Sequence, residues 1–411
     1  MSSFTQLGPD IDGEALGDQS GYSVSLSSDG SVLAIGAREN DGNGSGSGHT
    51  RIYQWDSASS SWNQLGSDIN GEAAGDDSGG SVSLSSDGSV LAIGAYNNDA
   101  NGADSGHTRI YKWDGSSWNQ LGSDIDGEAA GDNSGWSVSL SSDGTVLAIA
   151  AIHNDGNGNQ SGHTRIYKWD GSSWNQLGSD IDGEAAGDQS GRVSLSSDGS
   201  VLAIGASTND GNGSNSGHTR IYKWNGSSWN QLGSDIDGEA SSDLSGIGVS
   251  LSSDGSVLAI GASTNDGNGS DSGHTRIYKW NGSSWNQLGS DIDGESANDN
   301  SGYSVSLSSD GSVLAIGAYN NDGNGSNSGH TRIYKWDGSS WNQLGSDIDG
   351  EAAGDWSGWS ASLSSDGSTV AIGARYNYRA GHVRVFSIAD DTAPTVQSVS
   401  SSTADGTYKA G

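Results

Sequence analysis

The sequence predicts an all-β fold, a seven-bladed β-propeller with four antiparallel strands in each blade. The first observation is a repeat, since Ser-Ser-Asp-Gly recurs between two apolar runs about every 56 residues. The aspartates of the seven copies are Asp29, Asp87, Asp143, Asp198, Asp254, Asp310 and Asp366. The second observation is a composition of 67 Gly and 2 Pro. Such a composition is typical of many short strands joined by tight turns.

The fifth copy illustrates the four strands, which we name A, B, C and D in chain order. We expect them at residues 249–252, 257–262, 274–280 and 285–292, because B is a compact apolar run and the others alternate apolar with polar residues. Asp254-Gly255 predicts a two-residue hairpin turn between A and B. The B–C loop and the D–A loop, which leads to the next blade, are longer and polar.

The two ends of the chain predict how the ring closes. Residues 4–11 read as a lone D strand, and the last copy stops after its C strand at residues 382–388. We therefore expect these two strands to pair and complete the last blade, which leaves no open sheet edge. The propeller then spans residues 1–389.

The composition changes after the last repeat. Residues 390–411 contain a Thr-Ala-Pro-Thr-Val segment that resembles the first strand of immunoglobulin-like or cadherin-like domains. We expect a linker and the truncated start of such a domain there, because 22 residues cannot build a whole one.

The charge of the chain limits its partners. A net charge of −34 repels nucleic acids and anionic membranes. The absence of Cys excludes disulfides and thiolate metal sites, and no segment approaches the apolar length of a membrane span. Buried aromatic side chains, from 15 Trp and 13 Tyr, supply much of the apolar area. We expect a monomeric domain of a larger multidomain chain, with no nucleic-acid partner and no membrane insertion.

Two motifs of the repeat point to a family. Gly-Tyr-Ser-Val-Ser-Leu at residues 21–26 is followed by Val-Leu-Ala-Ile-Gly-Ala at residues 32–37, and the unit resembles the FG-GAP repeat of integrin α-subunit propellers. The segment Gly-Asp-Asn-Ser-Gly-Trp-Ser-Val at residues 131–138 resembles the bacterial and algal branch more closely. The Phe of the family name is replaced by Ser, as at Ser134, and the integrin-type calcium hairpin is shortened to Ser-Asp-Gly. The resemblance therefore does not imply calcium at that hairpin.

The B–C loops carry a different acidic pattern. Oxygen donors at positions 1, 3 and 5 followed by Gly match the first half of an EF-hand-type loop, so Ca²⁺ is a candidate cofactor. The candidate ligands are Asp41, Asn43, Ser45, Asp155, Asn157, Asp210, Asn212, Asp266, Asn268, Asp322 and Asn324. The acidic D–A loops emerge on the same face and could share the ion. No Glu follows at the twelfth position, and Asp, Asn and Gly also build turns, so a purely structural role remains open.

The positions at which the copies differ predict a ligand site. They lie just before strand A and just after strand B, near the channel on the face of the B–C and D–A loops. Their aromatic members are Tyr22, Tyr96, Trp136, Tyr303, Tyr319, Trp359 and Tyr376. Flat apolar faces beside Asn and Arg suit sugar or peptide recognition, whereas loop positions can also drift without function.

Every C strand begins with histidine, and the seven are His49, His107, His163, His218, His274, His330 and His382. A ring of seven could hold metal or respond to pH, but one identical residue in every blade is more typical of a framework hydrogen-bonder. Strand alternation places Arg276 on the same face, where we expect it to stack on an aromatic ring and pair with a carboxylate of the adjoining blade.

The sequence contains no recognisable catalytic arrangement, so we do not expect an enzyme. We expect a non-catalytic binding or adhesion module of a secreted or cell-surface protein, which recognises an extracellular glycan or protein on the loop face. A purely structural spacer is the alternative. A carbohydrate-active enzyme using carboxylates such as Asp12 and Glu14 is a further one, although these residues recur in nearly every blade. Propellers host unrelated functions, so the fold cannot choose among these.

Overall fold

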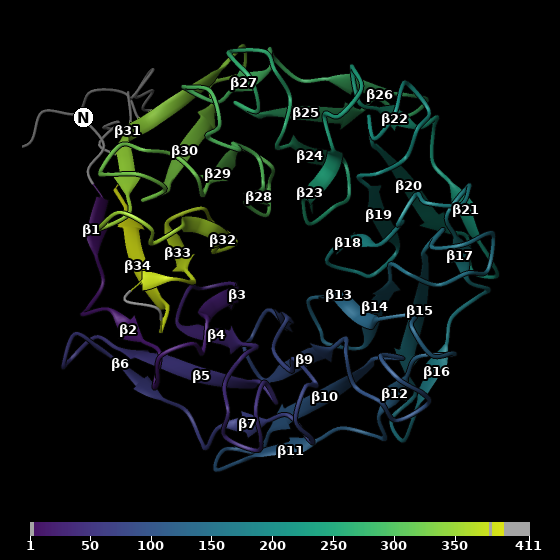
Figure 1. Ribbon diagram of the computed structural model, residues 1–411, viewed down its shortest axis with the longest axis vertical. Coiled ribbons are helices and arrows are strands. Elements are labelled where there is room, and N and C mark those ends of the chain that lie inside the picture. The colour runs from purple at the N-terminus through teal and green to yellow at the C-terminus, as the bar shows by residue number, and fades with distance from the viewer. Residues whose placement is uncertain (1–3, 378–379, 390–411) are drawn as a thin grey trace, which may run out of the picture.

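Seven antiparallel sheets surround a central channel in the computed structural model of the protein (Figure 1). The structure describes residues 4–377 and 380–389. It has the predicted all-β, seven-bladed propeller architecture. The segment 390–411, where we expect a linker and the start of another domain, lies outside the described residues. Within the described part, no helix has the length and hydrophobicity needed to span a membrane.

The inner two strands of each blade build the channel wall and the layer behind it. The A strands are β3 (Ser20–Leu26), β8 (Ser81–Leu84), β13 (Ser134–Leu140), β18 (Arg192–Leu195), β23 (Ser245–Leu251), β28 (Ser304–Leu307) and β32 (Ser357–Leu363). The B strands are β4 (Val32–Ala37), β9 (Val90–Ala95), β14 (Val146–Ala151), β19 (Val201–Ala206), β24 (Val257–Ala262), β29 (Val313–Ala318) and β33 (Thr369–Ala374). Every residue of the B strands is buried, as their continuous apolar sequence predicts.

Of the outer two strands, C is buried over its first five residues and D forms the partly exposed outer edge. The C strands are β5 (His49–Asp56), β10 (His107–Trp113), β15 (His163–Trp169), β20 (His218–Trp224), β25 (His274–Trp280), β30 (His330–Trp336) and β34 (His382–Ile388). The D strands are β6 (Ser61–Gln64), β11 (Trp118–Gln120), β16 (Trp174–Gln176), β21 (Trp229–Gln231), β26 (Trp285–Gln287), β31 (Trp341–Asp349) and β1 (Phe4–Gln6). Short strands that follow D in six blades are β7 (Ile69–Asn70), β12 (Ile125–Asp126), β17 (Ile181–Asp182), β22 (Ile236–Asp237), β27 (Ile292–Asp293) and β2 (Ile11–Asp12).

Two local predictions need correction. The predicted D strand at residues 285–292 is broken into β26 and β27 around Gly289, which has a φ of +85°, whereas β31 continues through the equivalent Gly345. The turn between A and B has four residues rather than two. Of Asp254 and Gly255 only Gly255 has a positive φ, and the Ser252 N–H donates to the Val257 carbonyl across the wider loop at 2.9 Å.

The N-terminal segment completes the last blade. Strand β1 pairs antiparallel with β34, with Phe4 opposite Ile388, and β2 pairs with the start of the same strand, with Asp12 opposite His382. The Leu7 N–H donates to the Val385 carbonyl at 2.7 Å between the two short strands. The first residues of the described chain therefore belong to the same sheet as the last ones (Figure 1).

A closed circle of backbone hydrogen bonds surrounds the channel at the A–B turns. The second serine of each Ser-Ser-Asp-Gly donates its N–H to the carbonyl of the equivalent serine in the next blade, over 2.7–2.9 Å. The circle runs through Ser28, Ser86, Ser142, Ser197, Ser253, Ser309 and Ser365 and returns to Ser28. The repeated motif therefore joins neighbouring blades.

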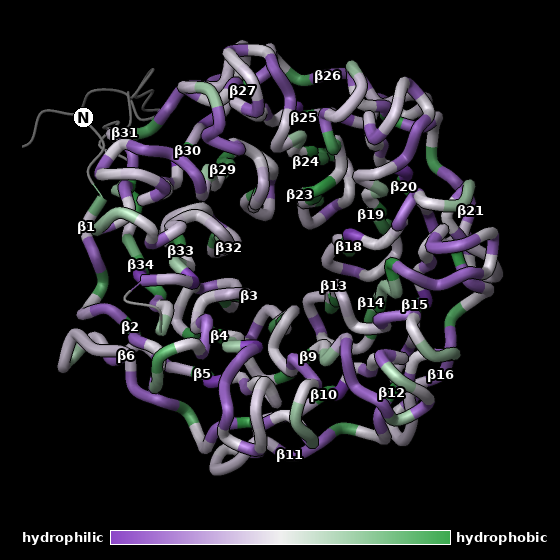
Figure 2. The backbone as a smooth tube through the Cα atoms, viewed as in Figure 1, coloured by the Kyte–Doolittle hydropathy of each residue, from purple (hydrophilic) through white to green (hydrophobic). Residues whose placement is uncertain are grey.

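The apolar core is divided into seven clusters that lie between adjacent blades. Between the second and third blades, Val90 and Ile110 of one sheet pack against Leu140, Leu147 and Ile149 of the next. In Figure 2, hydrophobic stretches follow the inner strands and hydrophilic stretches dominate the connections. Burial between blades supplies the main favourable free energy of such a fold, so each blade depends on its two neighbours.

Candidate functional site

The variable positions before strand A meet at one end of the channel. Together with adjacent Ser and Val residues they line a cavity of about 220 Å³. The seven positions hold Tyr22, Gly80, Trp136, Arg192, Ile247, Tyr303 and Trp359. This end, which we call the rim, varies from blade to blade among five residue types, as the sequence predicts.

Most of the predicted aromatic residues form one contact cluster contributed by the last, first and sixth blades. Trp359 lies at its centre, with ring centroids 4.4 Å from Tyr303, 5.0 Å from Tyr319 and 5.6 Å from Tyr22. The Arg375 guanidinium lies over the Trp359 ring, 3.4 Å from its centroid. We call these residues, with Trp356 and Tyr376, the rim cluster. Trp356 is 5.3 Å from Tyr319 and 4.8 Å from Tyr376.

A second group extends the rim toward the second and third blades. The Tyr96 and Trp136 rings are 4.8 Å apart, and Arg38 bridges to the rim cluster, since it lies 4.3 Å from the Tyr22 ring centroid and donates to the Tyr96 hydroxyl. Tyr96 donates in turn to Asp77 at 2.7 Å. Tyr96 is only 5% exposed, so it supports its neighbours and offers almost no surface to a ligand. The expectation of exposed aromatic rings therefore needs correction: Tyr96 is buried, and the other six are half-buried because they pack on one another.

Burial sets the protonation states at the rim. It raises the pKa of the hydroxyls of Tyr303 and Tyr319, so both remain hydrogen-bond donors at neutral pH. Burial also lowers the pKa of the Arg375 guanidinium, although nearby tyrosines oppose this shift. Arg375 still carries its charge at neutral pH, because arginine starts from so high a value. Its Nε has no hydrogen-bond partner among the described residues. The rim therefore combines stacking surfaces, hydroxyl donors and one incompletely paired cation.

Two members of the rim cluster are absent from the predicted set. Arg375 is one of the variable positions after strand B, but its position over the Trp359 ring depends on how the segment after β33 packs against β32. Trp356 has a φ of +58°, a left-handed conformation that is uncommon for a bulky residue. The equivalent residues of the other blades share this conformation and are Gln19, Asp77, Asn133, Gln189, Leu244 and Asn300. Comparing these seven positions in the sequence would have identified Trp356 as a member of the site, because it is the only aromatic residue among mostly polar ones.

The B–C loop residues predicted as calcium ligands make hydrogen bonds within the framework. In the third blade, Asp155 accepts the N–H of Gln160 at 2.7 Å, which closes its own loop. The Asn157 amide donates to the carbonyls of Gly183 and Glu184 at 2.9 and 2.8 Å and holds the D–A loop. The B–C loops of the first, second, fourth, fifth and sixth blades repeat this arrangement, so the B–C and D–A loops share one face as expected. These bonds give the pattern a structural role, and calcium binding stays a prediction.

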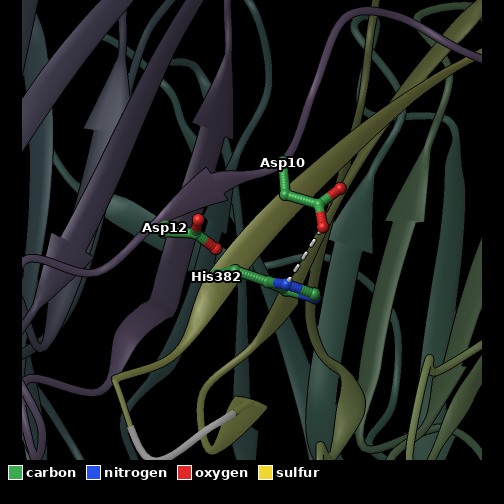
Figure 3. Close-up of side chains that lie close together, drawn as sticks. All are labelled: Asp10, Asp12 and His382. Atoms are coloured by element: carbon green, nitrogen blue, oxygen red, sulfur yellow. Dashed lines mark ion pairs between the residues drawn. The ribbon is translucent and has the colours of Figure 1, made fainter.

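The seven histidines at the starts of the C strands lie beside carboxylates. Each approaches a Glu of the D–A loop that enters its blade and an Asp from the D segment of its own blade. The sets are Glu14–His49–Asp68, Glu72–His107–Asp124, Glu128–His163–Asp180, Glu184–His218–Asp235, Glu239–His274–Asp291, Glu295–His330–Asp347 and Glu351–His382–Asp10. Figure 3 shows His382 with Asp10 and Asp12, and the Asp10 carboxylate points to the His382 ring at 3.8 Å. Glu351 Oε2 lies at the same distance from His382 Nδ1. The sequence predicts the row of histidines but not these carboxylate partners.

The arginines of the C strands join neighbouring blades as expected. The Arg276 guanidinium lies 5.7 Å from the Tyr278 ring centroid and 3.6 Å from the Glu239 carboxylate of the preceding D–A loop. It also donates to the Asp237 carbonyl at 2.6 Å. This arrangement repeats around the ring and stabilises the contact between blades.

Comparisons with known proteins agree with the geometry. A family model described as the FG-GAP repeat matches residues 292–334. Among solved structures, a chain of hydrazine synthase from Kuenenia stuttgartiensis is similar, with 14% identity, a TM-score of 0.57, and coverage of 92% of this chain and 97% of that one. At that identity the likeness shows the fold alone. A search of the curated proteins found no match. Altogether 739 solved chains match this one, and since propellers host unrelated functions, function has to be argued from the site.

Proposed function

Since the chain is a seven-bladed propeller with FG-GAP repeats, we propose that it is a non-catalytic binding module that holds its ligand at the rim. FG-GAP repeats are typical of extracellular proteins, and we place the module in a secreted or cell-surface protein on that ground. The ligand class that fits the rim best is a carbohydrate. The observation that carries the proposal is the rim cluster, in which Trp359, Tyr303 and Arg375 meet at one side of the channel mouth.

Three features support this use of the rim. The aromatic residues are concentrated in the sixth, seventh and first blades, whereas the fourth and fifth contribute Arg192 and Ile247. Trp356 occupies a left-handed position that the other six blades fill with Gln, Asp, Asn or Leu, so the aromatic ring there is specific to this side of the rim. Half-buried rings also keep part of their faces open, and a sugar ring can stack on such a surface while its hydroxyls bond to Tyr22 and Tyr303, which line the cavity.

A glycan array probed with the purified protein tests the proposal. We expect binding that Trp359→Ala abolishes and Trp136→Ala weakens, because Trp359 is the centre of the rim cluster and Trp136 belongs to the second group that extends the rim. Trp169→Ala is the matched control. Trp169 is also half-buried, but it packs against Trp174 at the outer edge, 5.5 Å between centroids, so this variant should lose some stability and keep binding.

The alternative outcomes are distinct. Binding of proteins but not of glycans, still lost in Trp359→Ala, would change the ligand class and keep the site. Failure to bind either class, or binding that survives Trp359→Ala, would overturn the proposal in favour of a structural spacer.

A further inference from the structure

The histidines at the blade junctions include buried rings without hydrogen-bond partners among the described residues: both nitrogens of three rings, and Nε2 of His218 and His382. His49 is 1% exposed, and neither of its ring nitrogens has a hydrogen-bond partner. His107, at 0% exposure, and His330, at 1%, are equally without partners. A buried polar group without a partner is rare and requires an explanation such as a bound water or ion. The same unusual feature repeated around one ring requires a common explanation.

The unpaired nitrogen faces two carboxylates. His49 Nδ1 lies 3.7 Å from Glu14 Oε2, which is too far for a hydrogen bond. His49 Nδ1, an oxygen of Glu14 and an oxygen of Asp68 all lie within 4.8 Å of one another. The remaining oxygens are already engaged, since Glu14 Oε1 is 3.9 Å from Arg51 and Asp68 Oδ1 accepts the Gln64 amide at 2.6 Å. Three atoms are left to converge on a common point: His49 Nδ1, one oxygen of Glu14 and one oxygen of Asp68.

The spacing fits a small divalent cation. With metal–ligand bonds of about 2.0–2.1 Å, neighbouring ligand atoms of a tetrahedral zinc site lie about 3.3–3.4 Å apart. The His330 Nδ1 distances to Glu295 Oε2 and Asp347 Oδ2 are 3.9 and 3.7 Å. Each ligand therefore has to move by only a few tenths of an ångström to reach bonding distance.

The charges favour a cation as well. Burial, reinforced by Arg51, lowers the pKa of His49 to about 4, so the imidazole is neutral near pH 7 and can present a lone pair. Glu295 and Asp347 lie close enough to share a hydrogen bond, and burial together with Asp347 raises the pKa of Glu295. Two crowded carboxylates outweigh the single nearby arginine, so a divalent ion would relieve their repulsion.

We propose that the His–Glu–Asp set at each blade junction is a binding site for a divalent transition metal of the Zn²⁺ class. Histidine Nδ1, glutamate Oε2 and aspartate Oδ2 supply three ligands, and the fourth position is open to water. Because the glutamate comes from the preceding blade, each ion links two blades. In the last set, Asp10 comes from the N-terminal segment, so an ion there also fastens that segment to β34 (Figure 3).

Calorimetric titration of chelator-treated protein with Zn²⁺ tests this proposal. We expect about seven equivalents to bind and the melting temperature to rise. His107→Asn should lower the number bound by one, because it removes one ligand from one junction. His153→Asn is the matched control: His153 lies outside the sets and bonds to Asn133 at 2.6 Å, so the number should not change.

A second pair of variants keeps the test decisive if His107→Asn does not fold. Glu72→Gln and Asp124→Asn preserve side-chain size, and each should remove one equivalent. Co²⁺ provides an independent readout, since its visible absorption shows tetrahedral nitrogen and oxygen coordination. Absence of binding, or a number of equivalents that none of these variants lowers, would overturn the proposal. Glycan binding at the rim does not enter this readout, so the two proposals can fail separately.

Discussion

The two ends of the channel are built on opposite plans. At the turn end, all seven blades contribute the same Ser-Ser-Asp-Gly segment, and the blades are joined by the closed circle of backbone hydrogen bonds. At the rim, the seven equivalent positions near the starts of the same strands hold five different residue types, namely Tyr, Gly, Trp, Arg and Ile. The closed circle of backbone hydrogen bonds requires the same turn geometry in every blade. The side chains at the rim can be substituted one at a time without breaking such a circle. The repeat is therefore uniform where it closes the ring and diverse where it can carry a specific function.

The largest expected effect comes from breaking the closure on which both ends depend. Deletion of residues 1–11 removes β1 and the start of β2, exposes the edge of β34 and uncovers the apolar contacts of Phe4 and Leu7. We expect the melting temperature to fall by about 10 °C or more in calorimetry. Adding the missing segment as a peptide should restore part of the loss. An unchanged melting curve would show that blade seven does not need its fourth strand.

A smaller effect is expected from adding a methyl group at Gly94, where the backbones of two blades approach closely near the rim. A Cβ on Gly94 would lie 2.0 Å from the Gly135 carbonyl of the next blade, and backbone on both sides prevents relief. Gly94→Ala should therefore lower the free energy of unfolding by about 3 kcal/mol in urea denaturation.

The third blade supplies a natural control for that substitution. It has Ala150 at the equivalent position, and the fourth blade has a shorter strand A there, with Gly191 close to the Ala150 methyl. Ala150→Gly should cost only about 1 kcal/mol, because it removes one buried methyl group and adds backbone freedom. Equal effects of the two substitutions would mean that the close backbone approach is not what limits this position.

The smallest expected effect is on the pH dependence of stability, to which the two ends of the channel contribute at opposite extremes of pH. At the turn end, burial is outweighed by hydrogen bonds from Ser89 and Ser85, which lower the pKa of Asp87, so its contribution to stability is present above about pH 4 and lost as the pH falls further. At the rim, burial raises the pKa of Tyr303. The unfolded chain releases that proton first, so stability is lost as the pH rises above about 10.

Two conservative variants check this contrast by urea denaturation across pH. Asp87→Asn should reduce the fall in unfolding free energy at low pH and leave its fall at high pH unchanged. Tyr303→Phe should reduce the fall at high pH and leave the fall at low pH unchanged. Either variant acting on the opposite side would contradict the assignment of each titration to one end of the channel.

The repeat made most of the fold predictable. The B and C strands of the fifth copy, Val257–Ala262 and His274–Trp280, begin and end at the predicted residues because each is a clear apolar or alternating run. The D strand and the A–B turn were predicted less well, since a single positive φ at Gly289 or Gly255 depends on packing that no local pattern reports.

The candidate sites were predictable only as sets of positions. Counting differences between copies located Tyr303, Trp359 and Arg375, but not the stacking of Arg375 on Trp359 or the burial of Tyr96. The histidine row was visible in the sequence, whereas its partners come from residues 35 positions earlier and 19 positions later, as for Glu14, His49 and Asp68. Those distances along the chain become contacts only when one blade packs on the next.

The sequence by itself determined the number of blades, their strands and the uniform circle of turns, because each depends on a local pattern written seven times. Tertiary structure alone decided which side chains meet. The rim cluster and the histidine–carboxylate sets both cross blade boundaries, where the angle and spacing of packed sheets bring together residues that no sequence period relates.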